Sequence, residues 1–300
     1  MTHLDLLNAV LALRFRQPGW PPILAEAGYL VHNVGVTFKL PDGAKVAPDV
    51  IATSQARNVA LLIEVKGGGG FDHDQAGRME RVTAEDLRHS AYLPIDPSAC
   101  RIGIVYVCSR EHHAAFEQAT ADRAGTVISF DGTSFQLGGN ALPDEMLAAA
   151  WAAATVTPGA PPLAIIPFDQ ESDAATIART VIPELVAILL RGAGVVFVDE
   201  ILQRTHHLVH SVMQPTGSKA EWQGLKKRVT EFLNEVARGE LNPWLERIPQ
   251  QPMWRFKSAV PADQTTRTRE LKNLQRSTQV LIERLGGGAG IQLELFDRLE

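Results

Sequence analysis

The segment IGIVYVC at residues 102–108 most limits the folds open to this chain, because it has no charged residue and is apolar almost throughout. A strand with one face in water alternates apolar and polar residues, whereas a buried strand reads as a continuous apolar run. We therefore expect residues 102–108 to lie at the centre of a sheet. A second apolar run, VALLI, continues into Glu64, Val65 and Lys66 and predicts a strand over residues 59–66.

The segments around these two runs alternate between helical and strand-like patterns. Apolar residues between Leu4 and Arg16 have helical spacing, and a short helix is expected over 22–27. Residues 30–40 and 46–52 predict two strands joined through the Pro-Asp-Gly turn at 41–43. A polar helix over 75–92, a helix over 111–124 and a strand over 126–130 follow. This order predicts an α/β domain over residues 1–154.

The pattern changes after a proline-rich segment, residues 155–175, which we interpret as a linker. Helices are expected over 174–191, 200–213 and 219–238, a short strand over 195–198, and two further strand-like pieces over 244–248 and 253–257. Residues 176–258 therefore form a mainly helical second domain. Residues 259–300 hold a polar helix near 267–285 and a glycine-rich tail.

Composition excludes several classes of protein. Hydrophobic residues make up 45% of the chain and charged residues 21%, as in globular proteins. The net charge of −5 means that any contact with nucleic acid must use local basic patches. Two cysteines predict neither a disulfide framework nor a zinc site. Without a signal peptide or a run of about 20 apolar residues, we expect a cytoplasmic protein with no membrane association.

The candidate catalytic residues lie at the end of the predicted 59–66 strand. Residues two apart share a face of a strand, so Glu64 and Lys66 point to the same side. If the 46–52 strand pairs with it, Asp49 lies opposite Glu64. Two carboxylates suit Mg²⁺, to which the Val65 carbonyl would add a ligand. Lys66 could then position or deprotonate a water, or stabilise charge on a phosphate. The four glycines at 67–70 would let a substrate backbone approach closely.

Pro48-Asp49, followed after fourteen residues by Glu64-Val65-Lys66, resembles the signature of the PD-(D/E)xK nuclease superfamily over about residues 1–135. The resemblance implies a mixed-sheet nuclease core with flanking helices. It also implies Mg²⁺-dependent hydrolysis of DNA phosphodiesters, with Mn²⁺ able to substitute. Asp49 and Glu64 would be metal ligands and Lys66 the third active-site group. Glu26 and Gln75 are additional candidates, although Met79 stands where a tyrosine would complete the submotif of Gln75.

The second domain resembles a winged helix, in which the last helix often enters the DNA major groove. Its helix–turn–helix–hairpin order carries the resemblance. An alternative remains open, because many winged helices bind only other proteins and the 219–238 helix is also acidic. The basic side chains that could meet phosphates are Lys219, Lys226, Lys227, Arg228, Arg255 and Lys257.

The tail reads GGGAG-IQLELF and resembles the clamp-binding peptide of bacterial replication and repair proteins. Leu295 and Phe296 would fill an apolar pocket of a sliding clamp, and Gln292 would hydrogen-bond at its edge beside Leu293. The alternative is a final strand of the second domain. A tethered enzyme would be concentrated at DNA that carries a loaded clamp.

These observations predict a metal-dependent endodeoxyribonuclease in DNA repair, restriction or antiviral defence. A homodimer is a further possibility, since many enzymes of this type need two copies to cut both strands. One alternative is a non-catalytic DNA-binding or scaffold protein with a degenerate nuclease core. Another is an RNA-directed hydrolase, because the same chemistry cuts either backbone. The histidines at 206, 207 and 210 are expected to be packed or surface residues.

Overall fold

The computed structural model of the chain divides into two compact units. Unit 1 comprises Met1–Ile165 and Ser211–Lys219, and unit 2 comprises Ile166–His210 and Ala220–Glu300. The boundary at 165/166 lies inside the predicted linker, 155–175. The residues that the structure describes are 1–17, 19–154, 162, 164–191, 194–213, 219–257 and 264–285.

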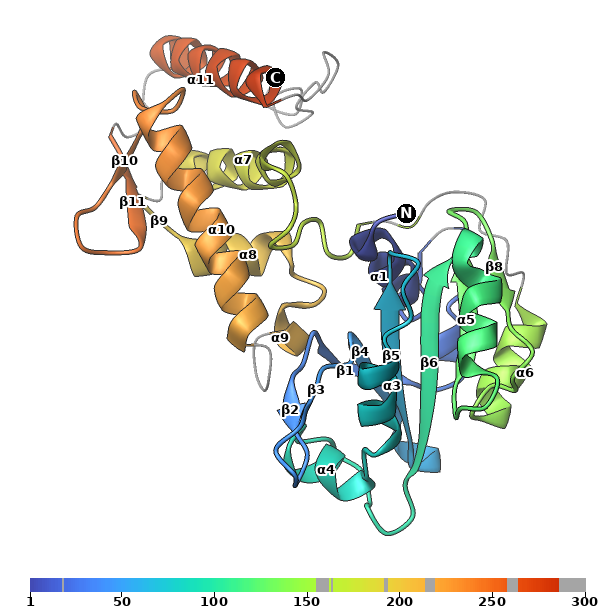
Figure 1. The fold of residues 1–300 in the computed structure, drawn as a ribbon. Helices are drawn as coiled ribbons and strands as arrows, with labels where there is room; N and C mark the ends of the chain where they lie inside the picture. Colours follow the sequence, from blue (N-terminus) through green and yellow to red (C-terminus); the bar gives the residue numbers. More distant parts are fainter. Residues whose placement is uncertain are drawn as a thin grey trace. The chain divides into compact units, whose positions relative to one another are not determined.

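Unit 1 is built on a mixed six-stranded sheet with the strand order β1-β4-β5-β6-β7-β8 (Figure 1). Its two central strands are β5 (Val59–Lys66) and β6 (Arg101–Ser109), which pair in parallel, as β6 and β7 (Thr126–Phe130) also do. The outer pairs are antiparallel: β1 (Leu30–Val34) with β4 (Val50–Ser54), β4 with β5, and β7 with β8 (Phe135–Leu137). The α/β fold and the central place of residues 102–108 are confirmed.

Helices cover both faces of this sheet, which explains why β5 and β6 are apolar on both sides. On one face, Leu62 of β5 and Tyr106 of β6 belong to a core that includes Ala76, Met79 and Phe116. These three come from α3 (His73–Glu80) and α5 (His113–Thr120). On the other face, residues of β5 to β8 line a small internal cavity with residues of three helices. Those helices are α1 (His3–Ala12), α2 (Ile23–Glu26) and α6 (Glu145–Ala153).

Two predicted elements of unit 1 are divided in the structure. The 30–40 strand becomes β1 and β2 (Phe38–Lys39), separated at Gly35, whose φ is +64°. Strand β2 then pairs with β3 (Lys45–Val46) around the predicted turn. The predicted 75–92 helix becomes α3 and α4 (Ala84–His89), because Thr83 and Asp86 form a capping box that starts a new helix.

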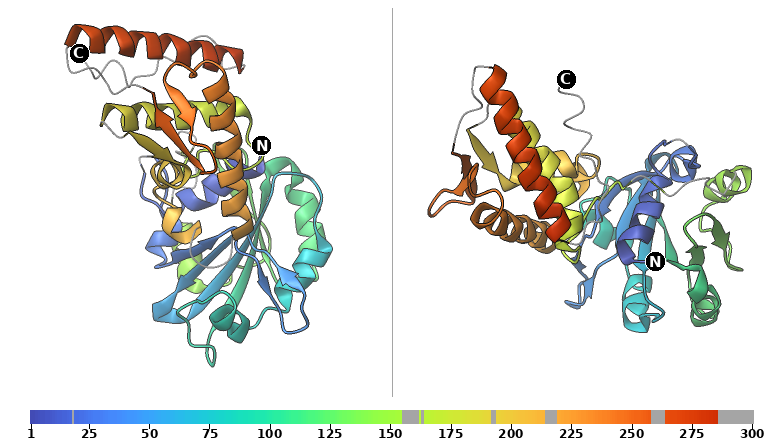
Figure 2. Two further views of the ribbon diagram at one scale, coloured as in Figure 1. Left: turned by 90° about the vertical axis from the view of Figure 1, so that its left-hand side faces the viewer. Right: turned by 90° about the horizontal axis from the view of Figure 1, so that it is seen from above.

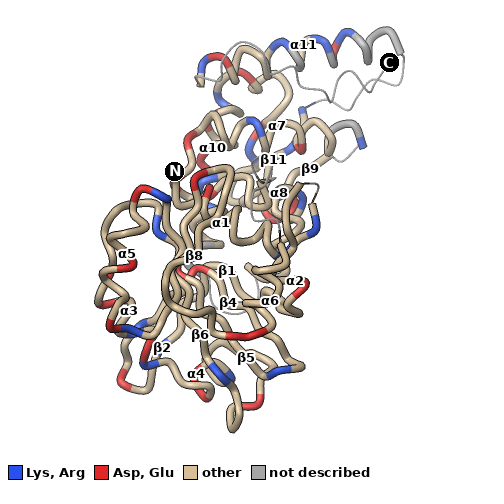
Figure 3. Tube along the Cα trace, turned by 90° about the vertical axis from the view of Figure 1, so that its right-hand side faces the viewer, with Lys and Arg blue, Asp and Glu red and all other residues tan. Residues whose placement is uncertain are grey.

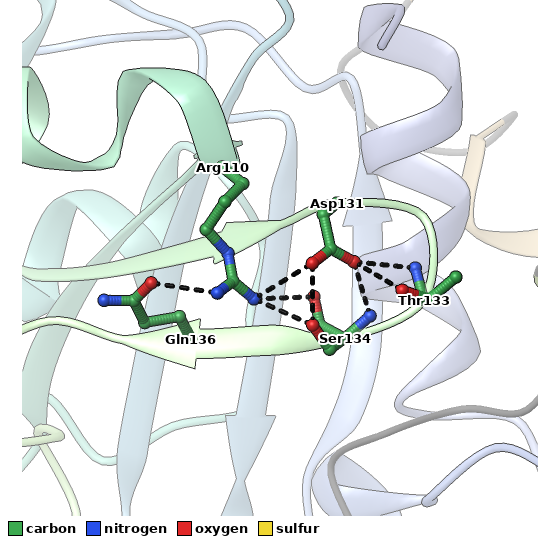
Figure 4. A network of polar contacts seen from close by, with 5 residues as sticks. All are labelled: Arg110, Asp131, Thr133, Ser134 and Gln136. Carbon is green, nitrogen blue, oxygen red and sulfur yellow. Dashed lines mark hydrogen bonds and ion pairs between the residues drawn. The ribbon is translucent and has the colours of Figure 1, made fainter.

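A polar network fixes the start of the segment that follows β6 (Figure 4). Arg110, in the short 3₁₀ turn Arg110–His112, donates to the Ser134 hydroxyl at 2.9 Å and to the Gln136 side chain at 3.0 Å. Asp131 accepts from the backbone N–H groups of Thr133 and Ser134 and so shapes the β7–β8 turn. The network therefore ties the residues after β6 to the β7–β8 hairpin.

Unit 2 is mainly helical, with a three-stranded sheet (Figures 1 and 2). In chain order it contains α7 (Ala174–Leu190), β9 (Val195–Phe197), α8 (Val198–Thr205), α10 (Lys219–Arg238), β10 (Leu245–Arg247) and β11 (Met253–Phe256). The short helix α9 (His210–Met213) follows α8, so the predicted 200–213 helix is interrupted. The strand order is β10-β11-β9, with antiparallel pairing throughout.

The last described helix, α11 (Gln264–Arg284), lies in the region predicted over 259–300 and is grouped with unit 2. Leu274, Leu281 and Ile282 are buried, and α11 packs against α7. Arg284 also pairs with Glu240 at 2.5 Å and with Glu235 at 3.0 Å. Among the described residues, no helix is both long and apolar enough to cross a bilayer.

Candidate active site at the end of strands β4 and β5

Asp49 stands directly before β4 and next to the last residues of β5. The β4–β5 register pairs Val50 with Ile63, so Asp49 is one position beyond that pair, opposite Glu64. The Asp49 Oδ2 atom accepts a hydrogen bond of 2.6 Å from the Val65 N–H. The Val65 N–H thus holds Asp49 in place, and the role of the Val65 carbonyl as a metal ligand stays a prediction.

Glu64 and Lys66 lie together, with 2.8 Å between Glu64 Oε1 and Lys66 Nζ. They continue the face of β5 that packs against α3 and α5, whereas Ile63 faces the cavity on the α1 side. The Glu64 side chain is 6% exposed, and its Oε2 atom is buried without a hydrogen-bond partner. A buried carboxylate oxygen without a partner is costly, so this atom calls for an explanation.

The electrostatics of the pair follow from this burial. Burial first, and then the charge of Asp49, raise the pKa of Glu64 to about 7, while Lys66 and the nearby Gln75 side chain oppose the shift. For Lys66, burial lowers the pKa, but the hydrogen bond to Glu64 and the charges of Asp49 and Asp72 outweigh it and leave the pKa raised. Lys66 is therefore a cation at neutral pH.

Gln75 is brought to the cluster by the first turn of α3. It is buried, and its Oε1 atom accepts from Arg78 at 3.0 Å. The helix begins there because Asp72 caps it by accepting from the Gln75 N–H at 2.8 Å. Thus the residues after the glycine segment supply one polar side chain and one further negative charge to the neighbourhood of Lys66.

Glu26 is not brought to this cluster. It is exposed at the end of α2. The following residue, Ala27, accepts through its carbonyl from Arg57, which comes after β4. Helix α2 therefore adjoins the end of β4 that carries Ser54, and Asp49 precedes the other end. The first helix, α1, supplies a histidine instead of an acid.

That histidine, His3, was not anticipated from the sequence. Its Nε2 atom lies 3.1 Å from Asp49 Oδ1. The capping pattern Thr2-x-x-Asp5 in the sequence does predict that a helix starts at residue 3, and the structure has this capping box. Nothing in the pattern says where the helix docks, so the contact with Asp49 appears only in three dimensions.

The cluster contains few side-chain ligands for a cation. Across the ranges that the structure describes, no group of three or more His, Cys, Asp or Glu side chains is arranged to hold a metal ion. Asp49 and Glu64 alone fit an ion that takes one or two carboxylates and keeps several waters, as Mg²⁺ does. The buried, unpaired Glu64 Oε2 atom is consistent with that role.

Most of the basic side chains proposed for DNA contact in unit 2 are engaged within the unit. Lys226 pairs with Asp199 at 2.7 Å, and Arg228 donates to the Ser172 carbonyl at 2.8 Å. Arg255 donates to Glu246, and Lys257 donates to Asn242. Lys227 is 77% exposed, with Glu231 3.9 Å away. The side chain of Lys219 is not among those described.

Figure 3 shows that both signs of charge occur along α10 and α11. A helix of mixed sign gives a weaker field at a phosphate backbone than a basic one. The clamp-like residues Gln292, Leu293, Leu295 and Phe296 lie outside the described residues.

Among the comparisons with known proteins, only a family model matches part of the chain. Residues 2–98 match the family model described as the MJECL32 domain. This segment runs from α1 to just before β6 and contains His3, Asp49, Glu64, Lys66 and Gln75. No curated protein matches the chain. No solved structure matches it either.

Proposed function

We propose that this protein hydrolyses phosphodiester bonds of DNA with the help of a divalent cation bound at Asp49 and Glu64. The observation that carries the proposal is the meeting of Asp49, Glu64 and Lys66 at the end of two neighbouring strands, with one buried Glu64 oxygen unpartnered. This is the arrangement that the resemblance to PD-(D/E)xK nucleases implies. The setting would be repair, restriction or defence.

Asp49 and Glu64 would hold Mg²⁺ or Mn²⁺, with the Val65 carbonyl as a further proposed ligand. A cation there would offset the burial and the repulsion by Asp49 that together raise the pKa of Glu64. When bound, it supplies Lewis-acid stabilisation of the phosphate and activation of a water molecule.

The chain's own residues would complete the chemistry. Lys66, kept protonated by its surroundings, would stabilise negative charge on the phosphate rather than remove a proton from water. Gln75 would orient Glu64. A Cβ atom at Gly68 or Gly70 would have nothing within 4 Å, so these positions leave room for a substrate backbone. The proposed role of Lys66 is therefore electrostatic.

Two features of unit 2 bear on DNA as the proposed substrate. Its elements run α8, α10, β10 and β11 in chain order, with the strand order β10-β11-β9, and the proposed DNA contact rests on the resemblance of the sequence to a winged helix. Four of the six proposed basic side chains have close partners within the unit, whereas Lys227 is 77% exposed and lies 3.9 Å from Glu231, so we propose Lys227 as the phosphate contact.

The tail remains the proposed site for a partner. On the sequence pattern alone, we propose the bacterial sliding clamp as the partner of Gln292–Phe296. We also propose a homodimer as the active form. A pull-down with purified clamp tests the first: Leu295→Ala combined with Phe296→Ala should abolish capture, whereas Asp297→Ala should not.

Plasmid cleavage tests the proposed activity. Wild-type protein with Mg²⁺ should nick or linearise supercoiled DNA, and chelation should stop it. Asp49→Asn and Lys66→Ala should each lower the rate by roughly 10²-fold or more. Glu26→Gln is the matched control and should cleave like wild type, because Glu26 is remote from the cluster.

The alternatives give different outcomes in the same assay. DNA binding without cleavage under any metal condition would favour a scaffold with a degenerate core. Cleavage of RNA in preference to DNA would change the substrate. Cleavage that survives both Asp49→Asn and Lys66→Ala would place the active site elsewhere and refute the proposal.

A further inference from the structure

The start of α1 lies against the end of β5, and a glycine makes this possible. A Cβ atom on Gly67 would lie 2.6 Å from the backbone nitrogen of His3 and 3.0 Å from the carbonyl carbon of Thr2. Real Cβ atoms do not approach backbone so closely. Gly67, the residue after Lys66, thus allows the first turn of α1 to reach the candidate site.

This close approach brings His3 onto Asp49, at 3.1 Å between His3 Nε2 and Asp49 Oδ1. A carboxylate oxygen only accepts, so the ring donates from Nε2. The second oxygen, Oδ2, accepts from the Val65 N–H at 2.6 Å. Both oxygens of Asp49 are therefore held, one by the backbone of β5 and one by a side chain of α1.

We propose that His3 is a positioning residue that orients the Asp49 carboxylate toward a bound divalent cation, and that Gly67 is glycine so that His3 can reach it. This inference rests on the proposed function. Groups that hydrogen-bond to metal ligands fix the direction of the ligand, and removing them typically lowers metal affinity 10- to 100-fold. The His3 side chain is 43% exposed, so its contact with Asp49 adds little to stability.

The chain offers two matched pairs of variants. His3→Ala removes the donor, whereas His3→Gln places an amide nitrogen near the position of Nε2. Gly67→Ala introduces the methyl group that would push α1 away from β5. Gly68→Ala adds the same methyl group one residue later, where it meets nothing within 4 Å. In each pair, the first variant should lose the contact between His3 and Asp49, and the second is a similar substitution that should keep it.

The measurement is Mn²⁺ affinity by calorimetry on full-length protein without DNA, with a thermal melt of each variant. We expect His3→Ala and Gly67→Ala to bind Mn²⁺ at least tenfold more weakly than wild type. His3→Gln and Gly68→Ala should stay within about threefold of wild type, and His3→Ala should keep the wild-type melting temperature.

Three results would overturn the inference in distinguishable ways. If Asp49→Asn loses Mn²⁺ binding but His3→Ala binds as wild type does, His3 has no positioning role and the proposed function stands. If wild-type protein binds no Mn²⁺, the metal site and the inference fail together. Equal weakening by His3→Ala and His3→Gln would also contradict it, because the amide should rescue the contact.

Discussion

At the scale of single residues, burial decides how each titratable group behaves. Glu64 and His206 are both buried, yet burial raises the pKa of the carboxyl group and lowers that of the imidazole, because it disfavours whichever form is charged. Glu64 has a cation beside it and an oxygen without a partner. His206 has both ring nitrogens in contact with polar atoms: the Phe168 carbonyl at 3.0 Å and the Thr205 hydroxyl at 2.8 Å. The surroundings of Glu64 are typical of a binding or catalytic site, and those of His206 are typical of a packed core.

His206 should make unit 2 less stable in acid. Burial lowers its pKa to about 4, so the unfolded chain takes up the proton first as the pH falls below about 6.5. The stabilisation is complete above that pH and is lost as the pH falls toward 4. Between pH 7 and pH 5, wild type should lose about 2 kcal/mol more than His206→Gln in urea unfolding. Parallel pH profiles for the two proteins would show that His206 does not titrate in this way.

At the scale of elements, one buried carboxylate joins three parts of unit 1. Asp144 caps α6 by accepting from the Leu147 N–H. It also pairs with Arg57 at 3.0 Å, and Arg57 in turn donates to the Ala27 carbonyl after α2. The Asp144 side chain is 2% exposed. This residue therefore fastens α6 to α2 and to the β4–β5 connection.

Substitution of Asp144 should separate the contribution of the cap from that of the ion pair. Asp144→Ala should destabilise the protein by about 3 kcal/mol or more, because it removes the cap and leaves Arg57 without its carboxylate. Asp144→Asn keeps a capping oxygen and should cost about 1 kcal/mol less than Asp144→Ala. Urea unfolding of both variants measures the difference. Equal losses would mean that the cap adds nothing at this position.

The elements predicted well from sequence are those whose signal is local. The apolar runs predict β5 and β6, and the Pro-Asp-Gly turn predicts the β2–β3 hairpin. The break between α3 and α4 also has a local signal in the sequence, the Thr83–Asp86 capping pair. The continuous run of polar residues around it led to the prediction of a single helix. The contact of His3 with Asp49 had none, because it depends on where α1 docks on the sheet. Asp49, Glu64 and Lys66 could be grouped because strand pairing relates them by register.

At the scale of the whole molecule, the proposed chemistry and the proposed DNA contact belong to different compact units. Asp49, Glu64 and Lys66 are in unit 1, and Lys227 is in unit 2. Substitutions in one unit should then affect one activity and spare the other. DNA binding and DNA cleavage can be measured independently, so this division is open to a direct test.

Asp49→Asn should bind DNA nearly as wild type does and fail to cleave it. Lys227→Glu should weaken binding and lower the slope of log affinity against log salt by about 1, because one phosphate contact is lost. Lys226→Gln is the control, since Lys226 already pairs with Asp199. Fluorescence anisotropy at several salt concentrations gives both quantities. An unchanged slope for Lys227→Glu would remove unit 2 from the proposed DNA interface.

The parallel pairing of β5 with β6 has a consequence for the order in which the chain folds. Residues 2–98, the segment that matches the MJECL32 domain, contain every side chain of the candidate site but end before β6. On a ribosome, a nascent chain of that length would hold β5 as an edge strand, with VALLI unpaired on one side and open to association with other chains. The site residues are made early, but β5 becomes an interior strand only after the residues of β6 that pair with it, Arg101–Cys108, have been added.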